Sequence, residues 1–246
     1  MAASTVVRLS LECVDVDKSF GLLKALDKVT FKLEGSIIKG LVGPNGSGKS
    51  TLINTITNVP YGADRGKIIF NGRNIERAKP QEICKNGIGR TFQGLTFFPS
   101  LTVEQNLLVG SSAVGTSDEV VRNALDVTEL SEKRHLKSSA LSVFELKRLM
   151  IATSLSIDPK LVLLDEPLSG LSEEESNQTL EIVRKINKMD KAVLIIEHKL
   201  RKVLNLCDEL LVLHLGKVLA DGKPGEVLKR EEVARAYFGE RSSTEN

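Results

Sequence analysis

Cysteine is scarce in this chain, and its few occurrences are scattered. Cys13, Cys84 and Cys207 match none of the spacings that bind a metal ion or build a disulfide framework. A zinc domain and a disulfide-rich secreted domain are therefore excluded. Thiols used in this way fit a reducing compartment, which favours the cytoplasm.

Long hydrophobic runs are missing as well. The apolar stretches extend over about six residues, far short of the roughly 20 that span a bilayer. The opening segment, MAASTVVRLSLE, contains no long apolar stretch and does not resemble a signal peptide. We expect no transmembrane segment, so any association with a membrane is predicted to be peripheral.

An excess of either charge is missing too. The 34 Lys and Arg residues nearly balance the 32 Asp and Glu residues, and the net charge is +2. This balance argues against nucleic acid as a partner, because nucleic-acid-binding domains carry a strongly basic surface. The composition, 41% hydrophobic and 27% charged over 246 residues, is that of a soluble globular protein with a sizeable core.

Short runs of Val, Leu and Ile alternate with helical stretches along the chain. The runs that suit strands buried on both faces of a mainly parallel sheet are residues 36–42, 161–165, 192–196 and 210–213. The predicted helices are residues 49–57, 142–157, 173–189 and 199–206. This alternation indicates an α/β fold with right-handed crossovers.

Two further regions have patterns of their own. Residues 6–14, 26–33 and 66–71 alternate apolar and polar side chains and predict a small antiparallel β subdomain. Residues 95–157 show helical periodicity at 102–109 and 117–130 and predict an inserted helical subdomain. We expect one domain over residues 1–240, with 1–94 and 158–215 as the core, 95–157 as the insert, 216–240 as a C-terminal extension, and 241–246 as a frayed tail.

Residues 43–50, GPNGSGKS, match the phosphate-loop pattern G-x-x-x-x-G-K-[ST] at every required position. The loop follows an apolar run and precedes a helical one, which is the strand–loop–helix context that the pattern needs. Lys49 is predicted to reach the β- and γ-phosphates of ATP, and the Ser50 hydroxyl to hold Mg²⁺. The predicted nucleotide contacts are Gly43, Pro44, Asn45, Gly46, Ser47, Gly48, Lys49, Ser50 and Thr51. The alternative is a glycine-rich turn that happens to carry a lysine.

Residues 160–166, KLVLLDE, form a hydrophobic strand that ends in two carboxylates. The ends of buried strands in α/β sheets face the ligand crevice. Asp165 is predicted to support Mg²⁺, directly or through water, and Glu166 to polarise the attacking water. The alternative is a pair of ordinary solvated carboxylates at a strand end.

Two more polar residues are candidates because of their positions. His198 follows the predicted strand 192–196, which favours a contact with the γ-phosphate, although a lone histidine is usually structural. Gln93 follows Thr91-Phe92 at the entrance to the helical insert. We expect Gln93 to contact Mg²⁺ and the attacking water; the alternative is a solvated loop glutamine.

The order of these motifs resembles that of ABC-transporter ATPase subunits, which share the P-loop NTPase fold. The phosphate loop, Gln93, Leu141-Ser142, Asp165-Glu166 and His198 occur in the family's order, over about residues 8–240. Phe20 stands where such proteins place an aromatic residue under the adenine ring. The segments most similar to the ATPases of branched-chain amino acid importers are GIGRTFQ (87–93), LTVEQNLLVG (101–110), IIEH (195–198) and AYFGE (236–240).

The resemblance implies a function for a dimer. In this family two subunits sandwich two ATP molecules, and each ATP lies between one phosphate loop and the signature, usually LSGGQ, of the other subunit. The helical insert and the Gln93 loop contact transmembrane permease subunits at the cytoplasmic face of the cell membrane. Phe97, Phe98 and Pro99 are candidates for this contact surface, and core packing is an equal alternative for them.

The chain departs from the family pattern at the signature, which reads Leu141-Ser142-Val143-Phe144-Glu145. Ser142 and Glu145 have capping-box spacing, so the helix start is expected to be intact. The family's second glycine presents its backbone N–H to the opposite ATP, and Phe144 adds a ring there. We expect impaired access to phosphate; the alternative is a ring that turns away into the helical subdomain.

Two smaller departures follow. Ser172 stands where the family usually has Asp or Asn, and with Glu175 it forms another capping box before an acidic first helical turn. Residues 94–141, which separate Gln93 from Ser142, form a shorter stretch than in the branched-chain relatives. This difference weakens the assignment of a substrate.

The sequence therefore predicts an ATP-binding and ATP-hydrolysing subunit of an ABC transporter with Mg²⁺ as cofactor, possible substrates being branched-chain amino acids. The alternatives are a soluble ABC ATPase of cluster assembly, repair or translation, and a regulatory subunit that binds nucleotide without hydrolysis. Because Phe144 affects the signature while Lys49, Glu166 and His198 are kept, we expect a heterodimer with a second ATPase subunit.

Overall fold

The computed structural model describes residues 9–198 and 200–238. They fall into two compact units, the first within Met1–Ala78 and Glu197–Asn246 and the second within Lys79–Ile196. Residues 6–8 of the first predicted strand, residue 199 of a predicted helix, residues 239–240 of the AYFGE segment and the tail 241–246 lie outside the described residues. The predicted division at 94, 157 and 215 stays a prediction.

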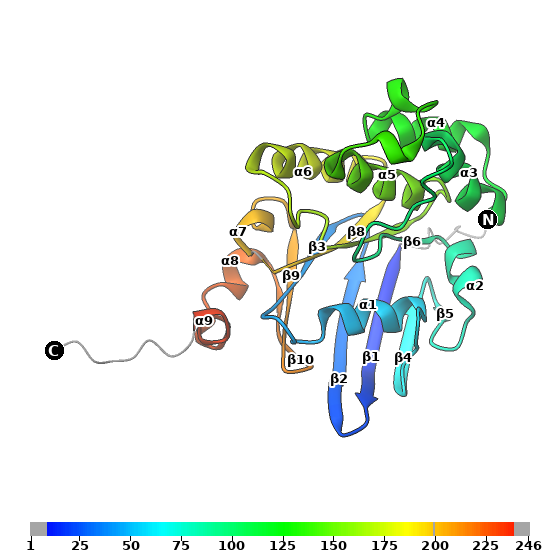
Figure 1. The fold of residues 1–246 in the computed structure, drawn as a ribbon. Coiled ribbons are helices and arrows are strands. Elements are labelled where there is room, and N and C mark those ends of the chain that lie inside the picture. Colours follow the sequence, from blue (N-terminus) through cyan, green and yellow to red (C-terminus); the bar gives the residue numbers. More distant parts are fainter. Residues whose placement is uncertain (1–8, 199, 239–246) are drawn as a thin grey trace, which may run out of the picture. The chain divides into compact units, whose positions relative to one another are not determined.

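An antiparallel sheet forms one part of the first unit (Figure 1). Its strands are β1 (Ser10–Phe20), β2 (Leu23–Glu34), β4 (Arg65–Phe70) and β5 (Arg73–Asn74), in the order β2-β1-β4-β5. The predicted antiparallel part is confirmed, although β1 extends to residue 20. Beyond the predicted end, Val16 is still fully buried, and irregularities between Cys13 and Val16 let the strand continue.

A second set of strands in the first unit contains β3 (Ile38–Val42), β9 (Glu209–His214) and β10 (Lys217–Gly222). β3 is parallel to β9, and β10 is antiparallel to β9. All five residues of β3 are buried, as the apolar run predicts. α1 (Lys49–Thr57) matches the predicted helix, whereas α7 (Leu200–Val203) is shorter than predicted. α8 (Pro224–Val227) and α9 (Glu231–Phe238) pack against β10.

The second unit combines parallel strands with most of the helices. β6 (Ile88–Arg90), β7 (Leu161–Asp165) and β8 (Ala192–Glu197) pair in parallel. Its helices are α2 (Pro80–Lys85), α3 (Val103–Val114), α4 (Asp118–Val127), α5 (Val143–Leu155) and α6 (Glu173–Asn187), with 3-10 turns η1 (Ser131–Lys133) and η2 (Ser138–Ala140). The helical character of residues 95–157 is confirmed, and α3, α4 and α5 pack together (Figure 1). The predicted α/β class with parallel core strands is confirmed.

Both predicted capping boxes are present. Ser142 Oγ accepts from the Glu145 N–H at 3.2 Å, and the Glu145 carboxylate accepts from the Ser142 N–H at 2.8 Å. Ser172 and Glu175 make the same pair of contacts at the start of α6. Each box satisfies amides that would otherwise lack an intrahelical partner, so the starts of α5 and α6 are fixed locally.

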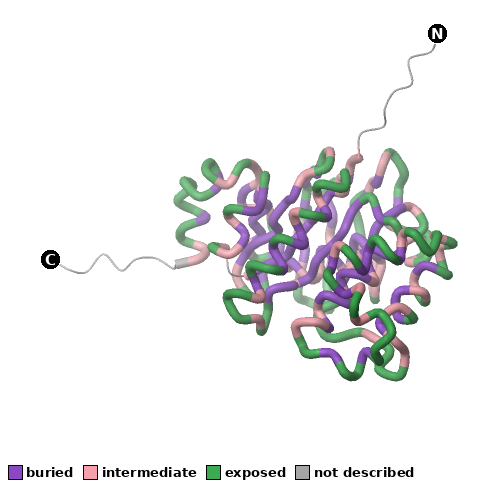
Figure 2. The backbone as a smooth tube through the Cα atoms, turned by 90° about the horizontal axis from the view of Figure 1, so that it is seen from above, coloured by how far each residue is buried: buried purple, intermediate pink, exposed green. Residues whose placement is uncertain are grey.

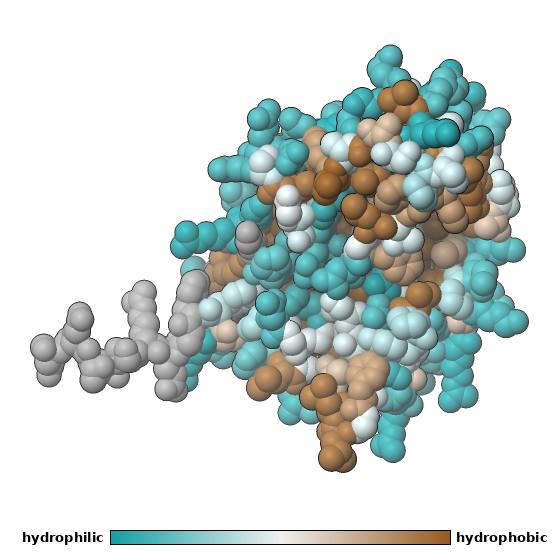
Figure 3. Space-filling model, in the orientation of Figure 1, coloured by the Kyte–Doolittle hydropathy of each residue, from teal (hydrophilic) through white to brown (hydrophobic). Residues whose placement is uncertain are grey.

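Burial is concentrated along the strands, while loops and the outer faces of helices are exposed (Figure 2). One hydrophobic projection is visible at the tip of the β1–β2 hairpin, where Leu22 and Leu23 are exposed (Figure 3). Among the described residues, no helix combines the length and the apolar character that crossing a membrane requires.

Candidate functional site

The phosphate loop joins β3 to α1 in the first unit. Gly43 has φ 155°, and a Cβ built on it would lie 2.1 Å from the carbonyl oxygen of Leu213. Gly48, the N-cap of α1, has φ 105°, and its Cβ would lie 2.7 Å from the carbonyl oxygen of Ala25. Both positions therefore require glycine, since any side chain would strain the backbone and meet backbone atoms.

Lys49 lies buried at the start of α1. Its ammonium group donates to the carbonyl oxygens of Gly43 at 2.8 Å and Pro44 at 2.9 Å, and lies 3.5 Å from Ser47 Oγ. These contacts hold a positive charge over the loop. A hydrogen bond from this ammonium group to a phosphate would be charge-assisted and therefore stronger than one between neutral groups. Asn45 and Gly46 form the exposed rim of the loop, and Ser50 and Thr51, both half-buried, follow Lys49 in the first turn of the helix.

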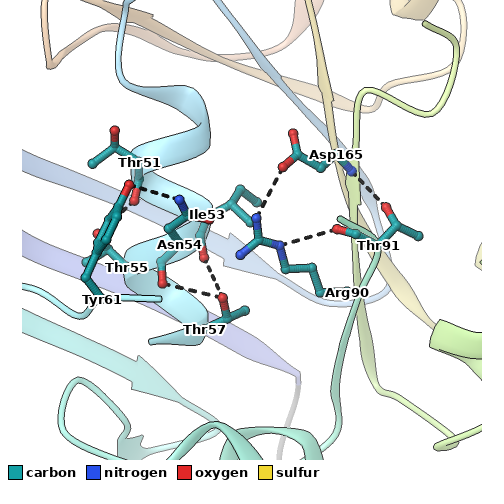
Figure 4. Close-up of polar contacts among 9 residues, drawn as sticks. All are labelled: Thr51, Ile53, Asn54, Thr55, Thr57, Tyr61, Arg90, Thr91 and Asp165. Atoms are coloured by element: carbon teal, nitrogen blue, oxygen red, sulfur yellow. Dashed lines mark hydrogen bonds and ion pairs between the residues drawn. The ribbon is translucent and has the colours of Figure 1, made fainter. Parts of the chain in front are cut away.

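α1 is secured by side-chain hydrogen bonds in its last turns (Figure 4). Thr57 Oγ1 donates to the Ile53 carbonyl at 2.9 Å, and Asn54 Nδ2 donates to the Tyr61 hydroxyl at 2.9 Å. The Tyr61 ring meets Phe20 edge-on, with centroids 4.9 Å apart. Phe20 is 43% exposed, and the Lys18 ammonium lies over its ring, 5.6 Å from the centroid. Its predicted contact with adenine stays a prediction. Tyr61 was not predicted.

A residue of the C-terminal helix α9 also reaches the phosphate loop. Burial raises the pKa of the Tyr237 phenol, and the nearby Gly43 backbone opposes that rise. The sequence gives no local signal for this contact, because the two residues lie at opposite ends of the chain.

In the second unit, Asp165 and Glu166 end β7 as predicted. The Asp165 side chain is 1% exposed and pairs with Arg90, whose Nη2 lies 3.2 Å from Oδ2 (Figure 4). Glu166 is half-buried and has φ 48°, a conformation that non-glycine residues rarely adopt. Its N–H donates to the Ile196 carbonyl at 3.1 Å. Strained backbone of this kind is often found at functional positions.

One cavity of about 230 Å³ brings three of the predicted residues together, namely Gln93, Asp165 and Glu166. Phe92 and Lys147 also line it. Lys147 donates to the carbonyl oxygen of Glu166 at 3.3 Å, which ties α5 to the segment after β7. The cavity therefore brings carboxylate, amide and ammonium groups together within a largely apolar lining, a combination typical of ligand sites.

The remaining predicted residues of the Gln93 loop are at the surface. Phe98 is 52% exposed and Phe97 is half-buried, so Phe98 does not belong to the core. The side chain of Asn106 accepts from the Phe98 N–H at 2.7 Å, which fixes the loop against α3. His198 directly follows β8 and is half-buried. Its predicted contact with the γ-phosphate stays a prediction.

The signature segment begins α5, with Ser142 exposed at the N-cap. The Phe144 ring lies along the helix, 4.2 Å from the guanidinium carbon of Arg148 one turn later. Arg148 is itself held by Gln178 of α6 at 2.8 Å and by Glu129 at 3.1 Å. The ring therefore takes the second of the two orientations considered from the sequence, whereas Val143, 56% exposed, projects from the first turn.

Charges near the signature are also paired. The Lys133 ammonium binds the Glu145 carboxylate and holds the pKa of that group below its usual range. Because Glu145 also closes the capping box with Ser142, the charged form of Glu145 supports the start of α5.

Each unit, taken by itself, contains oxygen donors of the kind that Mg²⁺ binds. Ser50 offers a hydroxyl in the first unit, and Asp165 and Gln93 offer a carboxylate and an amide in the second. Mg²⁺ usually keeps few protein ligands and binds the phosphates of its nucleotide. Within residues 9–198 and 200–238, no group of three or more His, Cys, Asp and Glu residues could hold a metal by itself.

A buried strand, a glycine-dependent loop and a helix that begins with Lys49 define a P-loop nucleotide-binding protein. Residues 26–169 match the family model described as ABC transporter. The probable branched-chain amino acid transport ATP-binding protein LivG of Archaeoglobus fulgidus is 35% identical over 95% of this chain and 96% of its own length. The high-affinity branched-chain amino acid transport ATP-binding protein LivG of Salmonella typhimurium is 33% identical over 90% of this chain and 94% of its own length.

Solved structures agree with these matches. The ADP conformation of MJ1267, an ATP-binding cassette of an ABC transporter, has a TM-score of 0.84 at 32% identity and covers 94% of this chain and 99% of that one. The chain belongs to the ABC transporter family, as an ATP-binding subunit. ATP-binding subunits of this family hydrolyse ATP, so the chain is an ATPase. The resemblance read from the motif order is confirmed.

Proposed function

We propose that this chain uses Mg·ATP binding and hydrolysis to drive transport through membrane permease subunits, as a peripheral subunit on the cytoplasmic face. The observation that carries the proposal is the phosphate loop, with obligatory glycines at 43 and 48 and a buried Lys49 above the loop carbonyls. The proposal is further supported by the cavity that Gln93, Asp165 and Glu166 line together, because these are the residues predicted to act in hydrolysis.

Each residue has a role that its chemistry supports. The loop amides and Lys49 neutralise phosphate charge, and Phe20 packs under adenine. Ser50, Asp165 and Gln93 hold Mg²⁺, which when bound neutralises charge on the phosphates. Glu166 accepts a proton from the attacking water, and His198 contacts the γ-phosphate. The residues with these roles are Phe20, Gly43 to Thr51, Gln93, Asp165, Glu166 and His198.

The proposed cargo is a branched-chain amino acid. The support is the similarity, at 33–35% identity, to branched-chain amino acid transport ATP-binding proteins whose lengths this chain covers almost completely. The test is uptake of leucine, isoleucine and valine by proteoliposomes that contain the chain with its co-purifying membrane subunits. Uptake of glutamate or of a sugar, with none of leucine, would overturn this assignment.

The proposed partner within the transporter is a second ATPase subunit with a glycine-containing signature. Ser142 and the first amides of α5 would contact the ATP of that subunit. Two larger residues replace the signature glycines here, and although the Phe144 ring lies on Arg148, Val143 remains exposed on the first turn. The phosphate loop of this chain would meet an intact signature, while its own signature would serve the partner poorly.

Light scattering tests dimer formation directly. The Glu166→Gln variant with Mg·ATP should stay largely monomeric when alone and should dimerise once Val143→Gly and Phe144→Gly are added. Lys49→Ala in the same background is the control that should abolish ATP-dependent association. Dimerisation of Glu166→Gln alone would show that the chain closes on itself and that the heterodimer proposal is wrong.

A further inference from the structure

Arg90 ends β6 next to the point where Asp165 ends β7. The two strands are parallel with Arg90 opposite Leu163, and the N–H of Thr91 donates to the Leu163 carbonyl at 2.9 Å. This register brings the side chains of Arg90 and Asp165 to the same edge of the ladder (Figure 4).

The two side chains form a buried ion pair. Arg90 Nη2 lies 3.2 Å from Asp165 Oδ2, and the side chains are 7% and 1% exposed. Thr91 Oγ1 accepts from the Asp165 N–H at 3.0 Å, and Arg90 Nε donates to the Thr91 carbonyl at 3.3 Å. A carboxylate buried to this degree is strongly unfavourable without a counter-charge, so the ion pair with Arg90 stabilises and orients the Asp165 side chain.

The same guanidinium group also holds the start of the Gln93 loop. Its carbon lies 4.8 Å from the centroid of the Phe92 ring, a cation–π contact. Phe92 precedes Gln93, and both line the cavity that Asp165 lines. Any movement of Arg90 away from Asp165 therefore changes a contact of the residue next to Gln93.

We propose that Arg90 is a positioning residue that holds the Asp165 carboxylate in place, would compete with a divalent cation for that carboxylate, and links its own position to Gln93 through Phe92. The inference rests on the proposed role of Asp165 toward Mg²⁺. A guanidinium group and a metal ion repel each other, and in a buried setting this repulsion is weakly screened. Arg90 would accordingly move away from the Asp165 carboxylate if a cation were bound there.

Mn²⁺ binding to the ADP-bound chain, followed by electron paramagnetic resonance at pH 8, measures the competition. Arg90→Met removes the competing charge and keeps most of the stem, so Mn²⁺ should bind about tenfold more tightly, the ratio that corresponds to about 1.4 kcal/mol. Arg90→Lys keeps a charge and should change the affinity less. Unchanged or weaker Mn²⁺ binding by Arg90→Met would overturn the competition.

Thermal unfolding in EDTA measures how much Arg90 stabilises the buried Asp165 side chain in the absence of metal. It also shows whether a variant is destabilised. Arg90→Met should lower the midpoint because it leaves a buried carboxylate without its counter-charge. Adding Asp165→Asn should restore much of the loss, since the second change removes the charge. If the two substitutions lower the midpoint additively, Arg90 acts by packing alone and the proposal is wrong.

Fluorescence tests the link to Gln93. The chain contains no tryptophan, so Phe92→Trp introduces a single reporter beside Arg90. Adding Mn²⁺ to the ADP-bound reporter should shift its emission, and Arg90→Met should abolish the shift although the metal still binds. An equal shift in both proteins would overturn the proposed transmission. If the unsubstituted chain binds ADP but no Mn²⁺, the role of Asp165 fails and this inference fails with it.

Discussion

The phosphate loop and the signature segment use glycine for different physical reasons. In the loop, Gly43 and Gly48 have φ of 155° and 105°, and a Cβ at either would lie within 2.8 Å of a backbone oxygen. In the signature, Val143 and Phe144 stand where the family has glycine, yet α5 forms with its capping box complete. Glycine is needed for backbone conformation in the first segment and only for space in the second.

This difference explains which departures a chain of this kind tolerates. A side chain at position 43 or 48 would distort the loop that is predicted to bind phosphate. A side chain at the start of α5 leaves the helix intact and changes only what can approach its amides. The Phe144 ring lies on Arg148, so the exposed bulk at the helix start comes from Val143.

The largest effect expected separates hydrolysis from binding. Glu166→Gln removes the group that accepts a proton, so ATP turnover should fall by about 10²–10⁴, while ATP affinity changes little. Steady-state phosphate release and calorimetry measure the two quantities. Glu174→Gln, on the exposed start of α6, is the matched control. Turnover within about threefold of the unsubstituted rate would show that Glu166 does not polarise the water.

Substitution of Gly43 tests whether the phosphate loop requires glycine for its backbone conformation. Gly43→Ala combines a positive φ with a contact to the Leu213 carbonyl oxygen, and should cost about 2–5 kcal/mol of unfolding free energy. Gly46→Ala is the control, because nothing lies within 4 Å of its Cβ and only the strain of φ 76° remains. Equal midpoints for the two variants in urea would contradict the steric reading.

A third change addresses the charge rather than the conformation. Lys49→Ala should weaken Mg·ATP binding at least about tenfold, because it removes a charge-assisted contact of roughly 1.5–3 kcal/mol. Calorimetry provides the measurement, and Lys85→Ala at an exposed position of α2 provides the control. Unchanged affinity would remove Lys49 from the site.

The smallest effect concerns the helix starts. Ser142→Ala and Ser172→Ala each remove one capping bond and should lower the unfolding free energy by about 1 kcal/mol. Only Ser142→Ala should also reduce ATP-dependent association with the second subunit. If Ser172→Ala reduces that association as much, Ser142 has no special role in it.

Local patterns predict the parts of the fold that depend on local physics. Apolar runs indicate β3, β7 and β9, and the S-x-x-E spacing indicates the starts of α5 and α6. By contrast, β6 has three residues and includes Gly89, and β10 reads KVLADG, so neither carries a strand pattern. Both form because a neighbouring strand supplies their hydrogen bonds.

Some residues of the candidate site can also be recognised from local motifs, whereas other contacts depend on the tertiary fold. The phosphate loop and Asp165-Glu166 are visible as motifs, whereas the Arg90–Asp165 pair joins residues 75 positions apart and needs the parallel register of two strands. The contact of Tyr237 with Gly43 likewise depends on the tertiary fold. The stacking of Phe144 on Arg148 has i, i+4 spacing, so a helical reading of α5 contains the signal for it.

The most direct test of the account is the ATPase rate per chain as a function of protein concentration. The unsubstituted chain should hydrolyse ATP slowly, at a rate per chain that hardly depends on protein concentration. The Val143→Gly, Phe144→Gly double variant should be faster, with a rate per chain that rises with concentration as its signature becomes accessible. Vigorous, concentration-dependent turnover by the unsubstituted chain would contradict the account, because it would show that this signature serves an opposite ATP without glycine.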